Sequence, residues 1–242
     1  MNRLLMTSAT VLALAACSPK PAEAPKPAPA PVAASPAPGE PVVPGMPEKT
    51  DAPVGVYKLD PAHTTLNFKL SHLGFSGFTS RFTKVDATLN FDPARPEAMS
   101  VEATIDPRSL DLIAPPKGFH DTLTGKGFLD AAAFPAITFK STKVEKTGPN
   151  TANVTGDLTL HGVSKPIVMA VTFNGGYPPN PYDGARIGFS ATTDFKRSDF
   201  GVGAGLPAPG TNMGVGDHVA VVIETEFGSG KPTASTPPPP PK

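Results

Sequence analysis

Apolar and polar side chains alternate with a period of two along much of residues 54–227, which is the pattern of half-buried β-strands. Between positions 85 and 91, for example, Asp86, Thr88 and Asn90 lie between apolar neighbours. The pattern predicts eight strands, with room for a further short strand at 56–59. The eight cover 66–70, 85–91, 101–105, 137–140, 154–160, 167–173, 187–191 and 219–227.

Turn-forming residues separate most of these strands. They are Asp92-Pro93, Gly148-Pro149-Asn150, His161-Gly162 and Asn174-Gly175-Gly176. A helical interruption is expected within 116–133, as two short helices at 117–123 and 128–133 that end before Pro135. The glycine-rich stretch 201–216 predicts a long loop, which is a candidate lid.

Eight amphipathic strands can pair as a sandwich or close into a barrel, and closure removes exposed sheet edges. The large aliphatic and phenylalanine side chains fall on one face, so this face forms the interior. This arrangement is opposite to that of an outer-membrane barrel, which is apolar outside. We therefore expect an all-β domain with an apolar interior. The pattern leaves open whether that interior is filled by side chains or holds a ligand, because barrels of about eight strands do either.

Proline content divides the chain into a folded segment and two tethers. Residues 18–53 hold 12 of the 32 prolines and residues 228–242 hold six more, and neither segment contains an aromatic residue. Both are predicted to be disordered, extended segments. All 14 Phe, all three Tyr and all five His lie in 54–227. That segment has a length suited to one domain with one core.

The N-terminus has the order of a secretory signal: Arg3, then a short apolar stretch, then small residues up to Cys17, the only cysteine. The stretch is too short to span a membrane, which takes about 20 apolar residues. Leu14-Ala15-Ala16-Cys17 resembles the bacterial lipobox, so residues 1–17 are expected to be a lipoprotein signal and Cys17 the acylated first residue. An ordinary signal peptide with an incidental cysteine is the alternative. Ser18 leaves the position after the cysteine without the Asp that favours inner-membrane retention, which favours the periplasmic face of the outer membrane.

Charge and motif content exclude several classes of function. The 21 basic residues balance the 21 acidic ones without a basic patch, so nucleic acid is not an expected partner. The histidines lack the spacing of a metal site, and we expect neither a metal nor a cofactor. Gly74-Phe75-Ser76-Gly77 is not a nucleophile elbow, and no phosphate loop or dinucleotide motif is present, so an enzyme is not expected.

An ordered set of segments resembles the YceI family of lipocalin-like barrels. Along the chain these are Tyr57–Phe68 with Asp60 and His63, His72–Phe78, Phe128–Asp130 with Phe134–Phe139, Gly156–Pro166, and Arg197–Gly201. Together they span nearly all of 57–227. The resemblance implies a single eight-stranded antiparallel lipocalin-like barrel. It also implies that the barrel interior binds a long isoprenoid lipid, such as a quinone or a polyprenyl phosphate.

The candidate ligand-binding residues are apolar side chains on the strand faces that are expected to point into the barrel, although plain core packing is the alternative for any one of them. They are Phe68, Leu70, Phe91, Phe139, Met169, Phe173 and Phe189. The candidate contacts for a lipid head group are His63, His72, Arg81 and Arg197. We expect a lipid-anchored protein that holds such a lipid for transport, storage or stress response. A structural envelope lipoprotein with a filled barrel that acts through partner contacts is the alternative, and a homodimer is left open.

Overall fold

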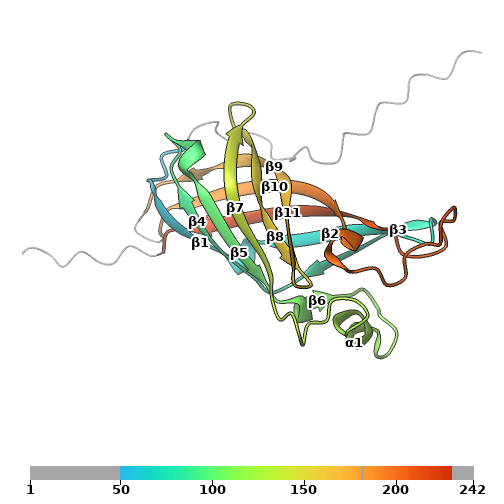
Figure 1. Ribbon diagram of the computed structural model, residues 1–242. Coiled ribbons are helices and arrows are strands. Elements are labelled where there is room, and N and C mark those ends of the chain that lie inside the picture. Colours follow the sequence, from blue (N-terminus) through green and yellow to red (C-terminus); the bar gives the residue numbers. More distant parts are fainter. Residues whose placement is uncertain (1–49, 181–182, 231–242) are drawn as a thin grey trace, which may run out of the picture. The chain divides into compact units, whose positions relative to one another are not determined.

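A closed antiparallel β-barrel forms the folded part of the chain in a computed structural model that describes residues 50–180 and 183–230 (Figure 1). Its strands are β1 Gly55–Leu59, β2 Thr65–His72, β3 Ser76–Phe82, β4 Val85–Phe91, β5 Ser100–Ile105, β6 Leu110–Asp111, β7 Ile137–Lys146, β8 Thr151–Leu160, β9 Val163–Tyr177, β10 Arg186–Lys196 and β11 His218–Gly228. Its helices are α1 Phe119–Thr124 and the short 3-10 helices Pro61–His63, Pro96–Ala98, Pro107–Ser109 and Arg197–Phe200. Among the described residues, no helix is long and apolar enough to cross a membrane.

Eight strand positions close the ring in the order β1, β4, β5, β7, β8, β9, β10 and β11, with β11 pairing back onto β1. Three positions are bent strands that carry two labels each. β2 continues β1 and pairs with β11 beyond it, β3 runs into β4, and β6 follows β5 and pairs with β3. The predicted eight-stranded antiparallel barrel is confirmed. Its eight predicted strands all lie within observed ones, and the short strand at 56–59 lies within β1.

Alternating burial follows the alternating sequence. In β8, Val154, Leu158 and Leu160 are buried, whereas Asp157 between them is exposed. Gly156 lies on the same inward phase, where a Cβ would meet Cζ of Phe139 on the neighbouring strand at 2.4 Å. The glycine therefore lets an aromatic ring cross the strand, which places large side chains inside the barrel without spreading its wall.

β3 was missed by the periodicity argument. Its inward phase contains Ser80, which is buried at 4% exposure and breaks the apolar alternation between Phe78 and Phe82. The Ser80 hydroxyl donates a 2.5 Å hydrogen bond to the backbone carbonyl of Asp111 in β6. A serine whose polar group is satisfied in this way can replace an apolar residue in the wall, and no hydrophobic signal marks it.

The helical and turn predictions are corrected in part. Within 116–133 only α1 is an α-helix, and the helix expected at 128–133 is a series of turns folded back onto α1, with Asp130 at φ 42° and its N–H donating to the Gly125 carbonyl. His161-Gly162 forms the expected tight turn, with both residues at positive φ. Asn174-Gly175-Gly176 is not a turn, because β9 continues through it with a bulge opposite Gly188 and Phe189.

The folded domain extends a few residues beyond 54–227 at both ends. Ala52 is 4% exposed, and the Tyr57 hydroxyl donates a 2.7 Å hydrogen bond to the Pro53 carbonyl. At the other end, the Ser229 hydroxyl accepts a hydrogen bond from the Ala185 amide. The rest of the two proline-rich segments, the signal at 1–17 and Cys17 lie outside the described residues.

Candidate functional site

A cavity of about 1300 Å³ lies inside the barrel, walled by the inward faces of its strands. Its volume exceeds the roughly 300–1,000 Å³ of common small-molecule pockets. The structure places all seven predicted ligand-binding side chains on its wall. They are Phe68, Leu70, Phe91, Phe139, Met169, Phe173 and Phe189. The alternation of the sequence therefore brings these residues, from five different strands, around one space.

Aromatic rings form a continuous series that follows β11, β10 and β9 and then crosses the interior from β9 to β4. The Phe91 and Phe173 ring centroids lie 5.9 Å apart, those of Phe173 and Phe189 lie 5.3 Å apart, and those of Phe189 and Phe227 lie 6.1 Å apart. These spacings are those of tilted and edge-on aromatic pairs, which hold one another's orientation. Because β4 lies four positions from β9 in the ring of strands, the rings form an apolar, ordered layer that reaches across the interior.

Among residues 50–180 and 183–230, four ionisable side chains line the cavity, namely Asp51, His72, Lys146 and Arg197. His72 ends β2 at one end of the barrel, and Lys146 ends β7 at the other. A ligand in the cavity would therefore meet an apolar wall along its length and ionisable groups near its ends. Lys146 was missed because it closes an alternating strand and belongs to no motif.

Arg197 is 5% exposed, and its guanidinium is bound to the backbone of the loop that precedes β11. Nε donates to the Gly216 carbonyl at 2.9 Å, and Nη2 donates to the Val215 carbonyl at 2.8 Å. Nη1 donates to the carbonyls of Val202 and Ala204, each at 2.8 Å. Burial lowers the pKa of this guanidinium from its usual value. Four of its five donors are thus committed to the loop 201–216, and Arg197 fixes that loop rather than offering a free head-group contact.

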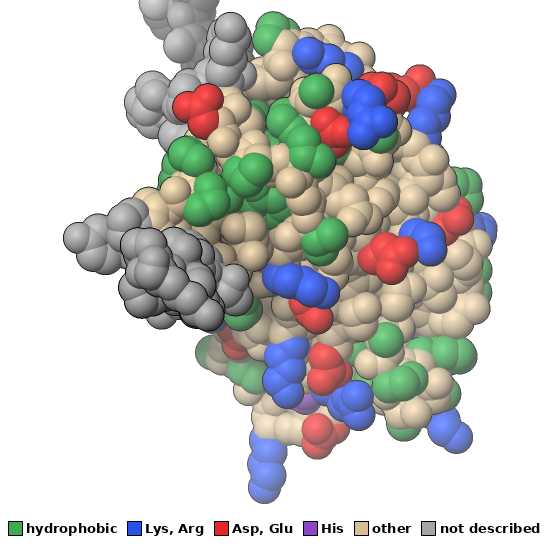
Figure 2. Space-filling view, turned by 90° about the vertical axis from the view of Figure 1, so that its left-hand side faces the viewer, with side chains coloured by type: hydrophobic (Ala, Val, Ile, Leu, Met, Phe, Trp, Pro, Cys, Tyr) green, Lys and Arg blue, Asp and Glu red, His purple; other side chains and the backbone are tan. Residues whose placement is uncertain are grey.

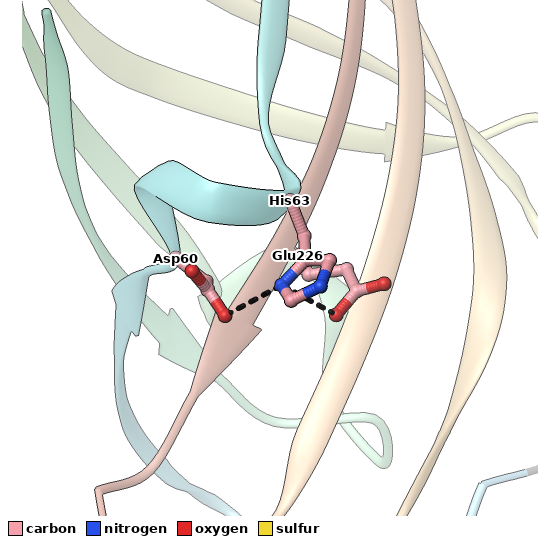
Figure 3. Close-up of side chains that lie close together, drawn as sticks. All are labelled: Asp60, His63 and Glu226. Atoms are coloured by element: carbon pink, nitrogen blue, oxygen red, sulfur yellow. Dashed lines mark hydrogen bonds and ion pairs between the residues drawn. The ribbon is translucent and has the colours of Figure 1, made fainter.

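Two other predicted head-group contacts, His63 and Arg81, lie away from the cavity wall. Arg81 pairs with Asp111, with Nη2 to Oδ2 at 2.7 Å and both side chains about half exposed. His63 lies in a cluster with Asp60 and Glu226, where the β1–β2 bend meets β11 (Figure 3). Neither position was predictable from the alternation, because His63 ends the short 3-10 helix Pro61–His63 and Arg81 lies in β3, which the periodicity missed.

The Asp60 cluster is an ion-pair network. The His63 ring Nδ1 lies 2.9 Å from Oδ2 of Asp60 and 4.0 Å from Oε2 of Glu226. Arg186 donates to the same Asp60 oxygen at 2.5 Å and to Glu226 at 3.2 Å. The hydrogen bonds from Arg186 and then His63 hold the pKa of Asp60 well below its usual range. The hydrogen bond to Asp60 and the charge of Glu226 raise the pKa of His63.

This cluster has the composition of a metal site, since Asp60, His63 and Glu226 place ligand atoms within 4.8 Å of one another. However, the positive charge that the two carboxylates attract is already supplied by the Arg186 guanidinium, which donates to both. A divalent cation there would lie against that guanidinium. The chemistry of the donor set therefore favours a structural role at the junction of β1, β10 and β11.

Residues 112–129 also contribute to the cavity, and sequence periodicity missed them. The side chains that this segment adds to the wall include Leu112, Ile113, Phe119, Leu123, Phe128 and Leu129. They follow neither a strand nor a complete helical repeat, so no period marks their inward side. The apolar run Leu112-Ile113-Ala114-Pro115-Pro116 was the available signal.

Comparisons with known proteins agree with this architecture. Residues 57–227 match the model of the YceI-like domain. A "UPF0312 protein" of Pseudomonas syringae pv. tomato is 44% identical over 140 residues, which cover 58% of this chain and 71% of that protein. A "UPF0312 protein" of Vibrio cholerae is 42% identical over 141 residues, covering 58% of this chain and 73% of that protein.

Solved structures show the same fold. The crystal structure of Burkholderia cenocepacia BcnA matches with a TM-score of 0.58 and 30% identity, covering 69% of this chain and 98% of that one. A polyisoprenoid binding domain from Saccharophagus degradans matches with a TM-score of 0.52 at 15% identity, covering 71% of this chain and 97% of that one. The barrel, its strand order and the family match over most of the domain lead to one conclusion: this chain belongs to the YceI-like family.

Proposed function

We propose that this protein binds a long apolar lipid of the isoprenoid class inside its barrel, with the quinones and polyprenyl phosphates as the chemical candidates. The observation that carries the proposal is the cavity of about 1300 Å³ inside the barrel, whose wall is predominantly apolar. The described polyisoprenoid-binding relative from Saccharophagus degradans supports the choice of ligand class. The cavity also favours this proposal over a structural lipoprotein with a filled barrel, which would be close-packed.

The energetics suit reversible exchange with a membrane. Burying a few tens of prenyl carbons from water at about 0.8 kcal/mol each would exceed the practical ceiling of roughly 20 kcal/mol for binding. A membrane lipid starts in hydrocarbon, so its transfer into the barrel gains little from apolar burial alone. Affinity then depends on packing against the aromatic wall and on contacts to the head group.

The same proposal places the protein in the bacterial envelope. It comprises secretion by the signal at 1–17, acylation of Cys17 and attachment to the periplasmic face of the outer membrane, where the protein acts as a carrier or store rather than as an enzyme. Two or more acyl chains anchor a protein stably. Mass spectrometry of the intact protein from the membrane fraction tests this part. A Cys17→Ser variant recovered with the same mass of attached lipid would contradict it.

The binding experiment uses two neighbouring residues that lie on opposite faces of β5. Ala103 lines the cavity, whereas Thr104 is exposed on the outer wall. In the Cys17→Ser background, Ala103→Trp places an indole inside the cavity, and Thr104→Trp adds the same group outside. Each protein is incubated with ubiquinone-10 or with undecaprenyl phosphate, separated from free lipid, and extracted for mass spectrometry.

We expect the parent and Thr104→Trp to retain one of the two lipids and Ala103→Trp to retain about tenfold less, because filling the space removes the site. Circular dichroism checks that both variants keep the β-sheet signal. The proposal is wrong if neither lipid stays with the parent and its own extract contains no hydrophobic ligand. It is also wrong if Ala103→Trp, while folded, binds as well as Thr104→Trp.

A further inference from the structure

One end of the barrel carries exposed apolar side chains on three loops. Phe75, at the tip between β2 and β3, and Ile113, after β6, are each 79% exposed. Met213, in the loop before β11, is 63% exposed, and Phe119, at the start of α1, is 40% exposed. In Figure 1 the β2–β3 tip and the loop before β11 lie to the right of the barrel, and α1 lies at the lower right. We call these four side chains the apolar rim.

Backbone contacts tie two of these loops together. The Leu73 amide donates to the Gly214 carbonyl at 2.7 Å, and the Gly216 amide donates to the Ser71 carbonyl at 2.7 Å. A Cβ added at Gly74 would meet Cβ of Asn212 at 2.8 Å, so the two tips are in direct contact. The rim is therefore held by the fold, and the Arg197 contacts to the same loop hold it from inside.

The rim continues into the cavity. Ile113 and Phe119 are exposed to solvent and also line the cavity wall, together with Phe78 and His72 from the neighbouring strands. An unbroken apolar path thus leads from the outer surface to the interior. A long lipid chain that followed this path from a bilayer would stay out of water, and water contact is what costs free energy for each methylene.

The segments around the rim carry few charges, apart from Asp121 on α1, whose side chain is 91% exposed two residues after Phe119. Residues 73–75, 112–118 and 201–216 contain one formally charged residue, Lys117. The opposite end of the barrel differs, since charged side chains of both signs lie among its hydrophobic ones (Figure 2). Loops with few charges and apolar tips can enter the boundary between head groups and acyl chains, and Lys117 beside them suits the lipid phosphates.

We infer that the apolar rim docks onto a lipid bilayer and opens the cavity toward it. This inference rests on the proposed function, because it supplies the route by which the lipid enters. Residues 18–49 could span at most about 100 Å at 3.1 Å per residue. The longest strand, β9, has 15 residues, or about 50 Å. An anchor at Cys17 therefore has enough chain to let this end face the membrane.

Single tryptophans test the docking, since the chain contains none. Phe75→Trp places the probe on the rim but outside the cavity wall. Val56→Trp is the matched control, because Val56 is 58% exposed and lies outside both the rim and the cavity wall. Phe189→Trp reports on the cavity interior. The full-length proteins are mixed with phosphatidylcholine vesicles whose acyl chains carry bromine, which quenches tryptophan on contact.

We expect the vesicles to quench about half of the Phe75→Trp emission, because docked apolar tips lie some 5–10 Å into the head-group boundary. The Val56→Trp emission should stay unchanged. The quenching should also change little with salt, since the rim loops carry so little charge. Equal quenching of the Phe75 and Val56 probes would overturn the inference.

The Phe189 probe separates this inference from the proposed function. Quenching at Phe189 without quenching at Phe75 would mean that the barrel takes in lipid without docking this end, and docking would then be rejected while lipid binding stands. A rate measurement gives a second check. Phe75→Glu combined with Met213→Glu should slow ubiquinone uptake from vesicles about tenfold, because charged groups resist entering the bilayer. An unchanged uptake rate would again reject docking.

Discussion

Arg197 offers the sharpest test of how the barrel holds its long loop. The Arg197→Met change keeps much of the length and apolar character of the side chain but removes the guanidinium. It therefore deletes four hydrogen bonds to the carbonyls of Val202, Ala204, Val215 and Gly216, all at 2.8–2.9 Å. The carbonyls that remain lie at a position where the Arg197 side chain is only 5% exposed.

The loss in the free energy of unfolding caused by Arg197→Met is set by two opposing effects. Each hydrogen bond from a charged donor contributes about 1.5–3 kcal/mol to stability. Burying a guanidinium costs several kcal/mol, and the loop can relax to expose some of the carbonyls to water. We expect a net loss of about 3 kcal/mol, close to the range seen when a buried charged group is removed from its partners. For a domain of this size, that loss corresponds to a fall in Tm of roughly 6–12 °C.

Urea unfolding followed by circular dichroism measures the loss, and Arg81→Met provides the matched control. Arg81 makes a direct ion pair with Asp111, but its side chain is 54% exposed, so its removal should cost at most about 1 kcal/mol. Hydrogen exchange should show faster exchange in 201–216 for Arg197→Met alone. If Arg197→Met destabilises the protein no more than Arg81→Met does, the loop is not held by this guanidinium.

Three further predictions concern the wall of the barrel. Gly162→Ala should lower the free energy of unfolding by about 1–3 kcal/mol, because Gly162 has φ 75° and a Cβ would meet a ring carbon of Phe134 at 2.4 Å; an unchanged urea midpoint would contradict this. Gly156→Ala should destabilise by about 1–3 kcal/mol and shrink the cavity, since its Cβ would force the Phe139 ring to move; a crystal structure with Phe139 unmoved would refute it. The pKa of Asp60 is depressed in the fold, so its contribution to stability is present above the unfolded pKa near 4 and is lost as pH falls below it. Asp60→Asn should therefore reduce the fall in the free energy of unfolding at acid pH, measured between about pH 2 and 7. An unchanged pH dependence would count against the Asp60 ion-pair network.

The fold was largely predictable because alternation carries direct information about a two-faced wall. Strands such as β4, at 85–91, were located to the residue, and their apolar phase pointed into the barrel. The alternation failed to predict the structure where an inward position holds a polar side chain or where the backbone leaves the regular repeat. Ser80 satisfies its hydroxyl on Asp111, and Asp130 adopts a left-handed conformation where helical propensity suggested a helix. Neither feature has a period.

The candidate site was also predictable only in part. Phe91, Phe173 and Phe189 could be assigned to the interior from their phase alone, and the structure places them on the cavity wall. For the candidate head-group contacts, the residue type gave no guide to position. Arg197 lies inside but is bound to its own loop, whereas His63 lies outside and belongs to the Asp60 cluster.

The pattern of the sequence by itself determined that the domain is all-β and that one face of each strand is apolar, and the resemblance to the YceI family added the closure of these faces into a single barrel. Only the tertiary structure decided that the interior is hollow and that residues 112–129 help to wall it. It also decided that four apolar side chains from three loops stand at one end. The physical reason is that alternation specifies which side of a strand avoids water. Whether the barrel interior is filled depends on the bends and register of the strands and on the sizes of side chains that come from strands far apart in the chain.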